Sequence, residues 1–440
     1  MDSFPPGYDL SPTTWFYLSF VLIVAVFFRF SRFWSLRNFD LGLLLAAPAG
    51  LLLVRDPETA PVGFTWLFAV TGMFLLRLLV DPFLRRRPHL GQNLNAPGSA
   101  FLCVAAFALL AMGAMNGRPT PATERTLQQA TNLVKGGESL EAEESTATVA
   151  GPVAPMIWAP IGAPFKAPEL AARVMAILSH LLVIVGLLLV GRNLFGDVQL
   201  GLAMATLYLM LPCTAYDVGE INYVLPSALT VWALVAYRRP MISGTLLGLA
   251  CGVMFFPVFL LPVWAAFYGR RGSLRFGSAL LLVAGVVLGI AALTAPGSDS
   301  FVRRTIGTIQ LEEMLKFEAP VGKLGFWTSE LRGFRIPVIA TFFVLLAGMT
   351  FWPRRKTLEH LTSYSAAIIV ATQFWYPEQG GVYLLWYLPL LLVVVFRPRL
   401  VHLQPQTGHV ENEQTLRSPS ASGPHAPRSS SYAERMHLFR

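Results

Sequence analysis

The sequence predicts an all-α protein: a polytopic bundle of transmembrane helices with about 11–13 hydrophobic segments and loops on its outer face. Hydrophobic residues make up 54% of the 440 residues and charged residues only 13%, whereas a soluble domain carries about 25% charged residues. The mean hydropathy of +0.54 indicates the same class. This number of charged residues is too small to cover a water-exposed surface. The composition therefore excludes a soluble globular protein.

The apolar runs predict where the spans lie, because a spanning helix needs about 20 mostly apolar residues. Residues 40–54 are short for a span and include Pro48, and residues 241–268 are long enough for one steep helix or for two half-length segments broken at Pro257. The candidate spans are residues 13–30, 40–54, 62–80, 99–115, 170–190, 198–216, 223–237, 241–268, 276–295, 336–352, 362–375 and 382–396.

Basic residues follow alternate spans, and cytoplasmic connections are the ones enriched in Lys and Arg. The intervening connections at residues 55–61 and 217–222 are net acidic. A single topology places every basic connection in the cytoplasm and the other connections outside, if residues 241–268 enter the membrane and return as a hairpin. The basic connections hold Arg32 and Arg37, residues 85–87, Arg192, Arg238 and Arg239, Arg270, Arg271 and Arg275, and residues 354–356.

This arrangement predicts a multi-pass integral protein of a bacterial inner (plasma) membrane, with its N-terminus outside and its C-terminus in the cytoplasm. The first eleven residues carry Asp2 and Asp9 but no Lys or Arg, which is typical of an uncleaved anchor rather than a secretory signal. The predicted organisation is four N-terminal membrane segments (1–115), an external loop with a short helix (116–168), a membrane core (169–400) and a disordered cytoplasmic tail (401–440). The short helix is expected within residues 121–137, where Leu127, Ala130 and Val134 recur at helical spacing.

Several function classes find no support in the composition. The net charge of +9 lies mostly in short connections and in the tail, where topology and anionic lipid explain it better than nucleic acid does. Cys103, Cys213 and Cys251 lie in or beside apolar segments without metal-ligand spacing, and three cysteines cannot form a closed disulfide framework. We therefore expect small buried thiols and assign no metal ligand, although a divalent metal cofactor stays open.

Two ionisable residues fall deep inside predicted spans. Arg77 lies about one turn from a cytoplasmic end, which favours a side chain that extends to the interface over a functional one. His180 is expected to bond to a neighbouring helix. No Asp or Glu falls at the centre of a predicted span, although ion-coupled transporters normally place such groups near the midplane.

Carboxylates gather instead in the connections predicted to lie outside. Glu124, beside Arg125, opens the expected loop helix, and Asp217 and Glu220 share a short turn between two spans. A carboxylate near paired arginines can deprotonate a hydroxyl while the arginines hold a phosphate. The alternative for each charge is a solvated loop residue. Two further outer sites are residues 298–335, with Arg303, Arg304, Glu312, Glu313, Lys316 and Lys323, and residues 375–378, which end in Glu378.

The order of features from about residue 99 to 396 resembles the GT-C superfamily of multi-span glycosyltransferases, which use polyprenyl-phosphate sugars. The motifs that carry the resemblance are LVKGG at 133–137, the proline-stepped segment 155–165, LVGRNLF at 189–195, GTLLGLA at 244–250 after Arg238 and Arg239, FFPVFLLP at 255–262 and YLLWYLP at 383–389. The chain departs from the family in two ways. Glu124 stands where the family usually keeps an Asp, often in a paired acidic motif, and four spans precede the first loop instead of one.

The resemblance implies a membrane enzyme that moves a sugar from a polyprenyl-phosphate donor to a lipid or glycan acceptor at the non-cytoplasmic face. It implies Glu124 as the catalytic base, Asp217 and Glu220 as sugar-positioning residues, and Arg303 and Arg304 as phosphate-binding residues. The expected partners are that donor, that acceptor and the lipid bilayer. A transporter or flippase for a lipid-linked glycan, and a catalytically inactive scaffold of the same fold, are the alternatives.

Overall fold

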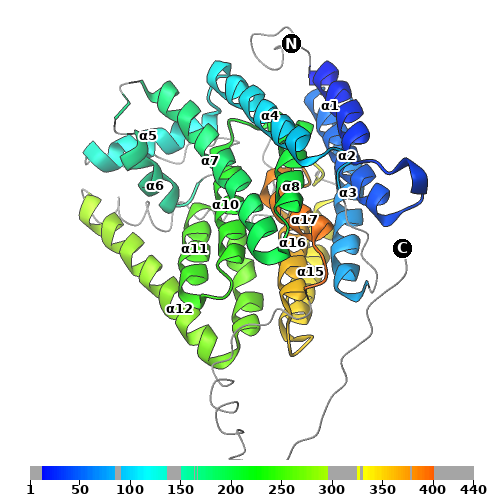
Figure 1. Cartoon of the computed structure of the whole chain (residues 1–440). Coiled ribbons are helices and arrows are strands. Elements are labelled where there is room, and N and C mark those ends of the chain that lie inside the picture. Colours follow the sequence, from blue (N-terminus) through cyan, green and yellow to red (C-terminus); the bar gives the residue numbers. More distant parts are fainter. Residues whose placement is uncertain are drawn as a thin grey trace, which may run out of the picture. The chain divides into compact units, whose positions relative to one another are not determined.

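The protein is described by a computed structural model that covers residues 12–84, 91–135, 150–162, 164–165, 167–295, 325–327, 331–376 and 379–400. Met1–Pro405 forms one compact unit, whose described part is helical and contains no strand (Figure 1). The second unit, Gln406–Arg440, lies outside the described residues, as does the predicted tail from residue 401.

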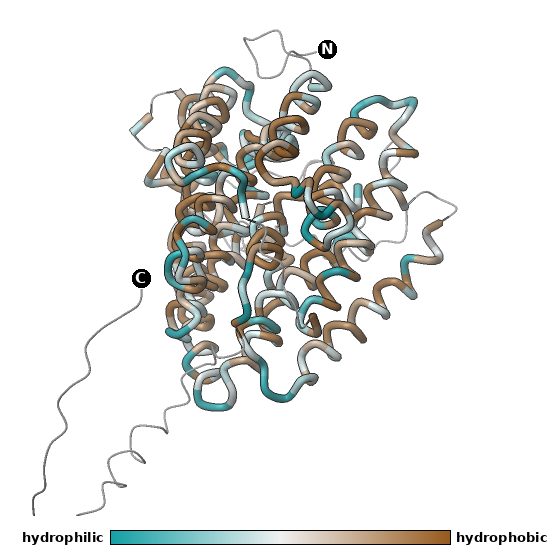
Figure 2. The backbone as a smooth tube through the Cα atoms, turned by 45° about the vertical axis from the view of Figure 1, so that its right-hand side comes forward, coloured by the Kyte–Doolittle hydropathy of each residue, from teal (hydrophilic) through white to brown (hydrophobic). Residues whose placement is uncertain are grey.

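Every predicted span contains helix, which confirms the all-helical class for the described residues. Among the described residues, five helical segments are long and apolar enough to cross a membrane: Leu36–Arg55, Ala60–Phe83, Ala96–Asn116, Pro168–Phe195 and Phe256–Thr294. In Figure 2 the helices are mostly hydrophobic and the hydrophilic stretches gather in their connections. The α-helices are α1 Pro12–Phe27, α2 Leu36–Arg55, α3 Ala60–Val80, α4 Ala96–Asn116, α5 Pro121–Lys135, α6 Val153–Gly162, α7 Pro168–Val190, α8 Val198–Met210, α9 Pro212–Tyr216, α10 Ile221–Val235, α11 Pro240–Val253, α12 Leu261–Thr294, α15 Arg335–Phe351, α16 Leu358–Trp375 and α17 Leu384–Phe396.

The predicted hairpin at residues 241–268 is confirmed. Helix α11 ends at Val253, the chain turns, and the next segment returns, so that the rings of Tyr237 and Phe267 lie 6.4 Å apart at one end. Pro257 and Pro262 occupy first-turn positions of a 3₁₀ turn and of α12, where their missing N–H costs nothing. The break therefore falls just before Pro257.

A second reversal lies inside α12 at Gly269, whose φ of 64° is readily adopted only by glycine. The rings of Trp264 and Phe276 are 6.5 Å apart, although twelve residues of straight helix would span about 18 Å. The part of α12 after Gly269 therefore folds back, and Arg270 and Arg271 lie at the same end as Arg238. The basic residues on both sides of residues 241–268 thus lie at one end of these helices, as the hairpin predicts.

The connection between α4 and α7, which is predicted to lie outside, contains more helix than the sequence predicts. Helix α5 buries Leu127 and Ala130 as expected but leaves Val134 exposed. Helix α6 was not predicted, because prolines interrupt it. Pro155 lies in its first turn, where no backbone donor is required, and Trp158 packs in a small core shared with α7 and α10.

The loop is fixed to α11 by a close backbone contact. The amide of Gly151 donates to the carbonyl of Val253 at 2.8 Å, and a Cβ on Gly151 would approach the carbonyl oxygen of Gly252 to 2.2 Å. Only glycine fits at that distance. The part of the loop just before α6 is therefore attached to the C-terminal end of α11.

The side chains of two later residues, Arg37 and Asn93, cap the C-terminal end of α1. Arg37 donates from Nε and Nη2 to the carbonyl of Phe27, at 3.0 and 2.6 Å. The Asn93 amide donates from Nδ2 to the carbonyls of Ala25 and Phe28, both at 3.0 Å. The last carbonyls of a helix have no intrahelical donor, so these two side chains let α1 end inside the protein.

A series of buried ion pairs, called the ion chain below, joins α2, α3, α16 and the end of α17. It runs Asp40–Arg77–Asp81–Arg397–Glu359: Arg77 pairs with Asp40 at 2.7 Å and with Asp81 at 2.8 Å, and Arg397 contacts Asp81 and also Glu359, the latter at 2.7 Å. Every side chain in it is at most 9% exposed. The expectation that Arg77 extends to the interface is therefore wrong, because two carboxylates reach it inside the protein.

Candidate functional site

The turn at residues 217–220 is the centre of the candidate site. It connects α9, which begins with Pro212, to α10. The backbone amide of Glu220 donates a hydrogen bond to the carbonyl of Asp217 at 3.0 Å. Asp217 and Glu220 therefore stand at the two ends of one tight turn. Both residues are half-buried.

Helix α5 lies against this turn. Thr123 donates from Oγ1 to the carbonyl of Gly219 at 2.7 Å, and Asn222 donates from Nδ2 to Oγ1 of Thr126 at 3.1 Å. The connection that carries α5 and the turn with Asp217 and Glu220 are thus in direct contact. Glu124 lies on the same turn of α5 as Thr123, but its side chain is exposed.

His180 supports the turn from the protein interior. Its Nδ1 lies 2.8 Å from the Tyr208 hydroxyl on α8, and its Nε2 lies 3.3 Å from the carbonyl of Val218. A carbonyl only accepts, so Nε2 carries the proton and the tyrosine hydroxyl donates to Nδ1. The prediction that His180 bonds to a neighbouring helix is confirmed, and the bond also fixes the middle of the carboxylate turn.

The carboxyl groups of the turn are easier to protonate than usual. Burial raises the pKa of Asp217 to about 6, against the opposing positive charge of Arg55. Burial, followed by the neighbouring Asp217 charge, raises the pKa of Glu220 to about 7, while a hydrogen bond from Thr120 acts the other way. Oε2 of Glu220 is buried and has no hydrogen-bond partner among the described residues. A carboxylate with a pKa near neutrality is suited to take up a proton.

These pKa values predict how the stability of the protein depends on pH. A carboxyl group whose pKa is raised by folding stabilises the fold at low pH, and this stabilisation is lost as the pH rises through about 7. Glu220→Gln should therefore leave stability unchanged at pH 4.5 but raise it at pH 8, on the order of 2 kcal/mol for a half-buried group. Thermal unfolding in detergent at the two pH values measures this. The exposed Glu169→Gln should show no such difference, and a Glu220→Gln profile parallel to wild type would refute the shift.

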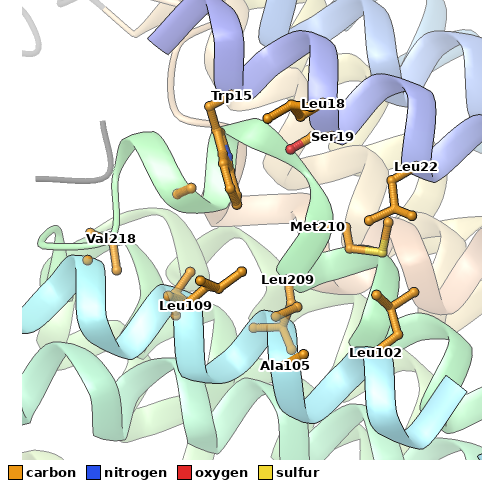
Figure 3. Close-up of a pocket in the computed structure, with 14 residues that line it drawn as sticks. Trp15, Leu18, Ser19, Leu22, Leu102, Ala105, Leu109, Leu209, Met210 and Val218 are labelled. Carbon is orange, nitrogen blue, oxygen red and sulfur yellow. The ribbon is translucent and has the colours of Figure 1, made fainter. Parts of the chain in front are cut away.

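An apolar groove adjoins the same turn (Figure 3). Helices α1 and α4 form its walls and the α8–α9 segment its floor, and its volume is about 160 Å³. Leu18 and Leu22 on α1 face Leu102 and Leu109 on α4 across it. Val218, the residue between Asp217 and Gly219, also lines it.

A cation that sequence reasoning missed lies at this end of the molecule. The guanidinium of Arg55, at the end of α2, lies 4.5 Å from the centroid of the Tyr216 ring. The Tyr216 hydroxyl donates to the carbonyl of Pro12 at 3.1 Å, which fastens the start of α1 to α9. Arg55 belongs to a connection that is acidic overall, so counting charges along the sequence did not single it out.

The other predicted site residues are not placed. Arg303 and Arg304 lie outside the described residues, as do the remaining charges of that segment up to Lys323 and also Glu378. Within the described part of the chain, His, Cys, Asp and Glu side chains form no group of three or more that would hold a metal ion. A divalent metal cofactor stays an open prediction.

Comparison of the chain with protein-family models, with curated proteins and with solved structures finds no match.

Proposed function

We propose that the protein is a membrane glycosyltransferase that moves a sugar from a polyprenyl-phosphate donor to a hydroxyl of a lipid or glycan acceptor. The reaction would take place at the carboxylate end of the bundle, on the non-cytoplasmic side. The observation that carries this proposal is the position of the Asp217–Glu220 turn, in contact with α5 of the first outer loop and beside an apolar groove. A proton acceptor beside a hydrocarbon-lined groove is suited to a substrate with a lipid tail.

Glu220 is the base in this proposal. Its carboxylate takes the proton of the acceptor hydroxyl, the hydroxyl oxygen bonds to the anomeric carbon, and the bond from that carbon to the phosphate oxygen breaks. Polyprenyl phosphate leaves with the electron pair, and Glu220 then releases the proton to water. The buried, unpartnered oxygen of Glu220 favours it as the base over Glu124. The side chain of Glu124 is exposed, and in this proposal it contacts the acceptor instead.

Asp217 has a separate role in the proposal. The charge of Arg55 acts on Asp217, and the charge of Asp217 contributes to the raised pKa of Glu220. Asp217 therefore tunes the base and orients the donor sugar, while Arg303 and Arg304 are kept as phosphate-binding residues on the resemblance alone. The reaction needs no redox partner.

The direct test is transfer from a labelled donor. Purified protein in liposomes is given a polyprenyl-phosphate sugar that is radiolabelled in the sugar, together with a mixture of membrane lipids and oligosaccharides as acceptors. We expect loss of label from the donor and a new labelled product. Movement of intact labelled donor across the bilayer without cleavage would establish the flippase alternative instead, and neither outcome would leave only the inactive scaffold.

A further inference from the structure

The apolar groove opens sideways between two helices. Leu18, Leu22 and Leu109 line it, yet they are 54%, 42% and 40% exposed. The outer faces of the same helices are apolar as well, with Val21 on α1 and Phe101 on α4 largely exposed. In a protein that spans a membrane, such an opening faces lipid chains rather than water.

The volume of the groove limits what fits in it. Sites for whole small molecules usually measure about 300–1,000 Å³, and this groove measures about 160 Å³. It holds a segment of one hydrocarbon chain, with the rest of the chain left in the bilayer. A bulky headgroup would have to lie beyond its end.

A cation lies near the polar end of the groove, over a tyrosine that follows one of the lining residues. Trp15, Ala215 and Val218 line that end, and Tyr216, under Arg55, follows Ala215 directly. Arg55 is exposed; its charge acts on Asp217, but it makes no ion pair with a described carboxylate. A position at the end of α2 favours a cation in any case. The Tyr216 ring orients the guanidinium of Arg55. A guanidinium that lies over an aromatic ring keeps the N–H groups at its edge free, and these can bind an oxyanion through two hydrogen bonds.

We infer that this groove and Arg55 bind a long single-chain lipid monophosphate, with the chain between α1 and α4 and the phosphate on Arg55. The inference deepens the proposed function, because such a lipid is the leaving group of the proposed reaction. It also assigns a task to the N-terminal helices, since α1, α2 and α4 all precede the first outer loop. It does not require sugar transfer to be observed.

The test measures binding of tritiated geranylgeranyl monophosphate to the full chain in phosphatidylcholine nanodiscs. Arg55→Gln removes the cation and should weaken binding about 10- to 100-fold, the range for hydrogen bonds to charged groups. It should leave binding of geranylgeraniol, which lacks the phosphate, unchanged. Arg29→Gln, at the other end of α1 and also exposed, is the matched control and should bind like wild type.

The groove is tested separately with Leu109→Trp, which fills it from α4. Binding of both the phosphate and the alcohol should fall at least tenfold, whereas Val104→Trp, on an exposed part of α4, should change neither. The inference is overturned if Arg55→Gln binds like Arg29→Gln, or Leu109→Trp like Val104→Trp. A protein that binds this lipid but transfers no sugar would keep the site and refute the proposed function.

Discussion

Glu220→Gln is expected to lower sugar transfer by about 100- to 10,000-fold, the usual contribution of a positioned general base. The substitution keeps the size of the side chain and removes its capacity to accept a proton. Because Glu220 has a pKa of about 7, wild-type transfer should rise about tenfold per pH unit below pH 6 and level off above pH 8. The residual activity of Glu220→Gln should lose this dependence. The measurement is the initial rate of labelled-donor consumption between pH 5 and 9.

Two further variants make this result interpretable. Glu169→Gln changes an exposed carboxylate in the first turn of α7 and should retain activity within about twofold of wild type. Glu124→Gln tests the base indicated by the family resemblance, and we expect a smaller loss than for Glu220→Gln. Collapse of transfer in Glu124→Gln with a normal rate in Glu220→Gln would restore Glu124 as the base.

Arg397→Met should destabilise the protein by about 3–5 kcal/mol, the cost of leaving buried charges without their partner. Arg397 lies between Asp81 and Glu359, and its side chain is fully buried. Asp81 would keep Arg77 and Ser363, which donates to it at 2.7 Å. Glu359 would keep only the amide of Leu400 among its described partners. The measurement is SDS-induced unfolding in mixed micelles, followed by tryptophan fluorescence.

The matched control is Arg399→Met, two residues along the chain at an exposed position, which should change stability by less than about 0.5 kcal/mol. The double variant Arg397→Met with Glu359→Gln should recover much of the loss, because it removes the unpaired carboxylate together with its partner. Equal stability of Arg397→Met and Arg399→Met would show that the ion chain contributes little.

The positions of the helices were largely predictable, because apolar runs and basic connections leave a membrane chain little choice. Residues 241–268 show this: the charges at both ends required a hairpin, and the structure contains one. Helix α6 was missed because prolines are normally taken as helix breaks, whereas Pro155 lies in a first turn. The ion chain was missed because its members are up to 357 residues apart, and no local pattern reports such a pairing.

The candidate site was predictable only in part. Acidic residues in connections predicted to lie outside singled out Glu124, Asp217 and Glu220, and α5 does lie against the turn that carries the last two. Which carboxylate is shielded from water depends on packing between segments about 100 residues apart, so the sequence did not rank Glu220 above Glu124. Arg55 was overlooked for a similar reason, since only its position over Tyr216 distinguishes it from other helix-end cations.

The capping of α1 by Asn93 bears on the order of events during biosynthesis. Asn93 is 68 residues beyond Ala25, whose carbonyl it binds, and translation at about 5–20 residues per second delivers it on the order of 10 s later. Until then the carbonyls of Ala25 and Phe28 lack this donor and depend on water. Helix α1 therefore reaches its final hydrogen bonding only when α4 begins to emerge from the ribosome.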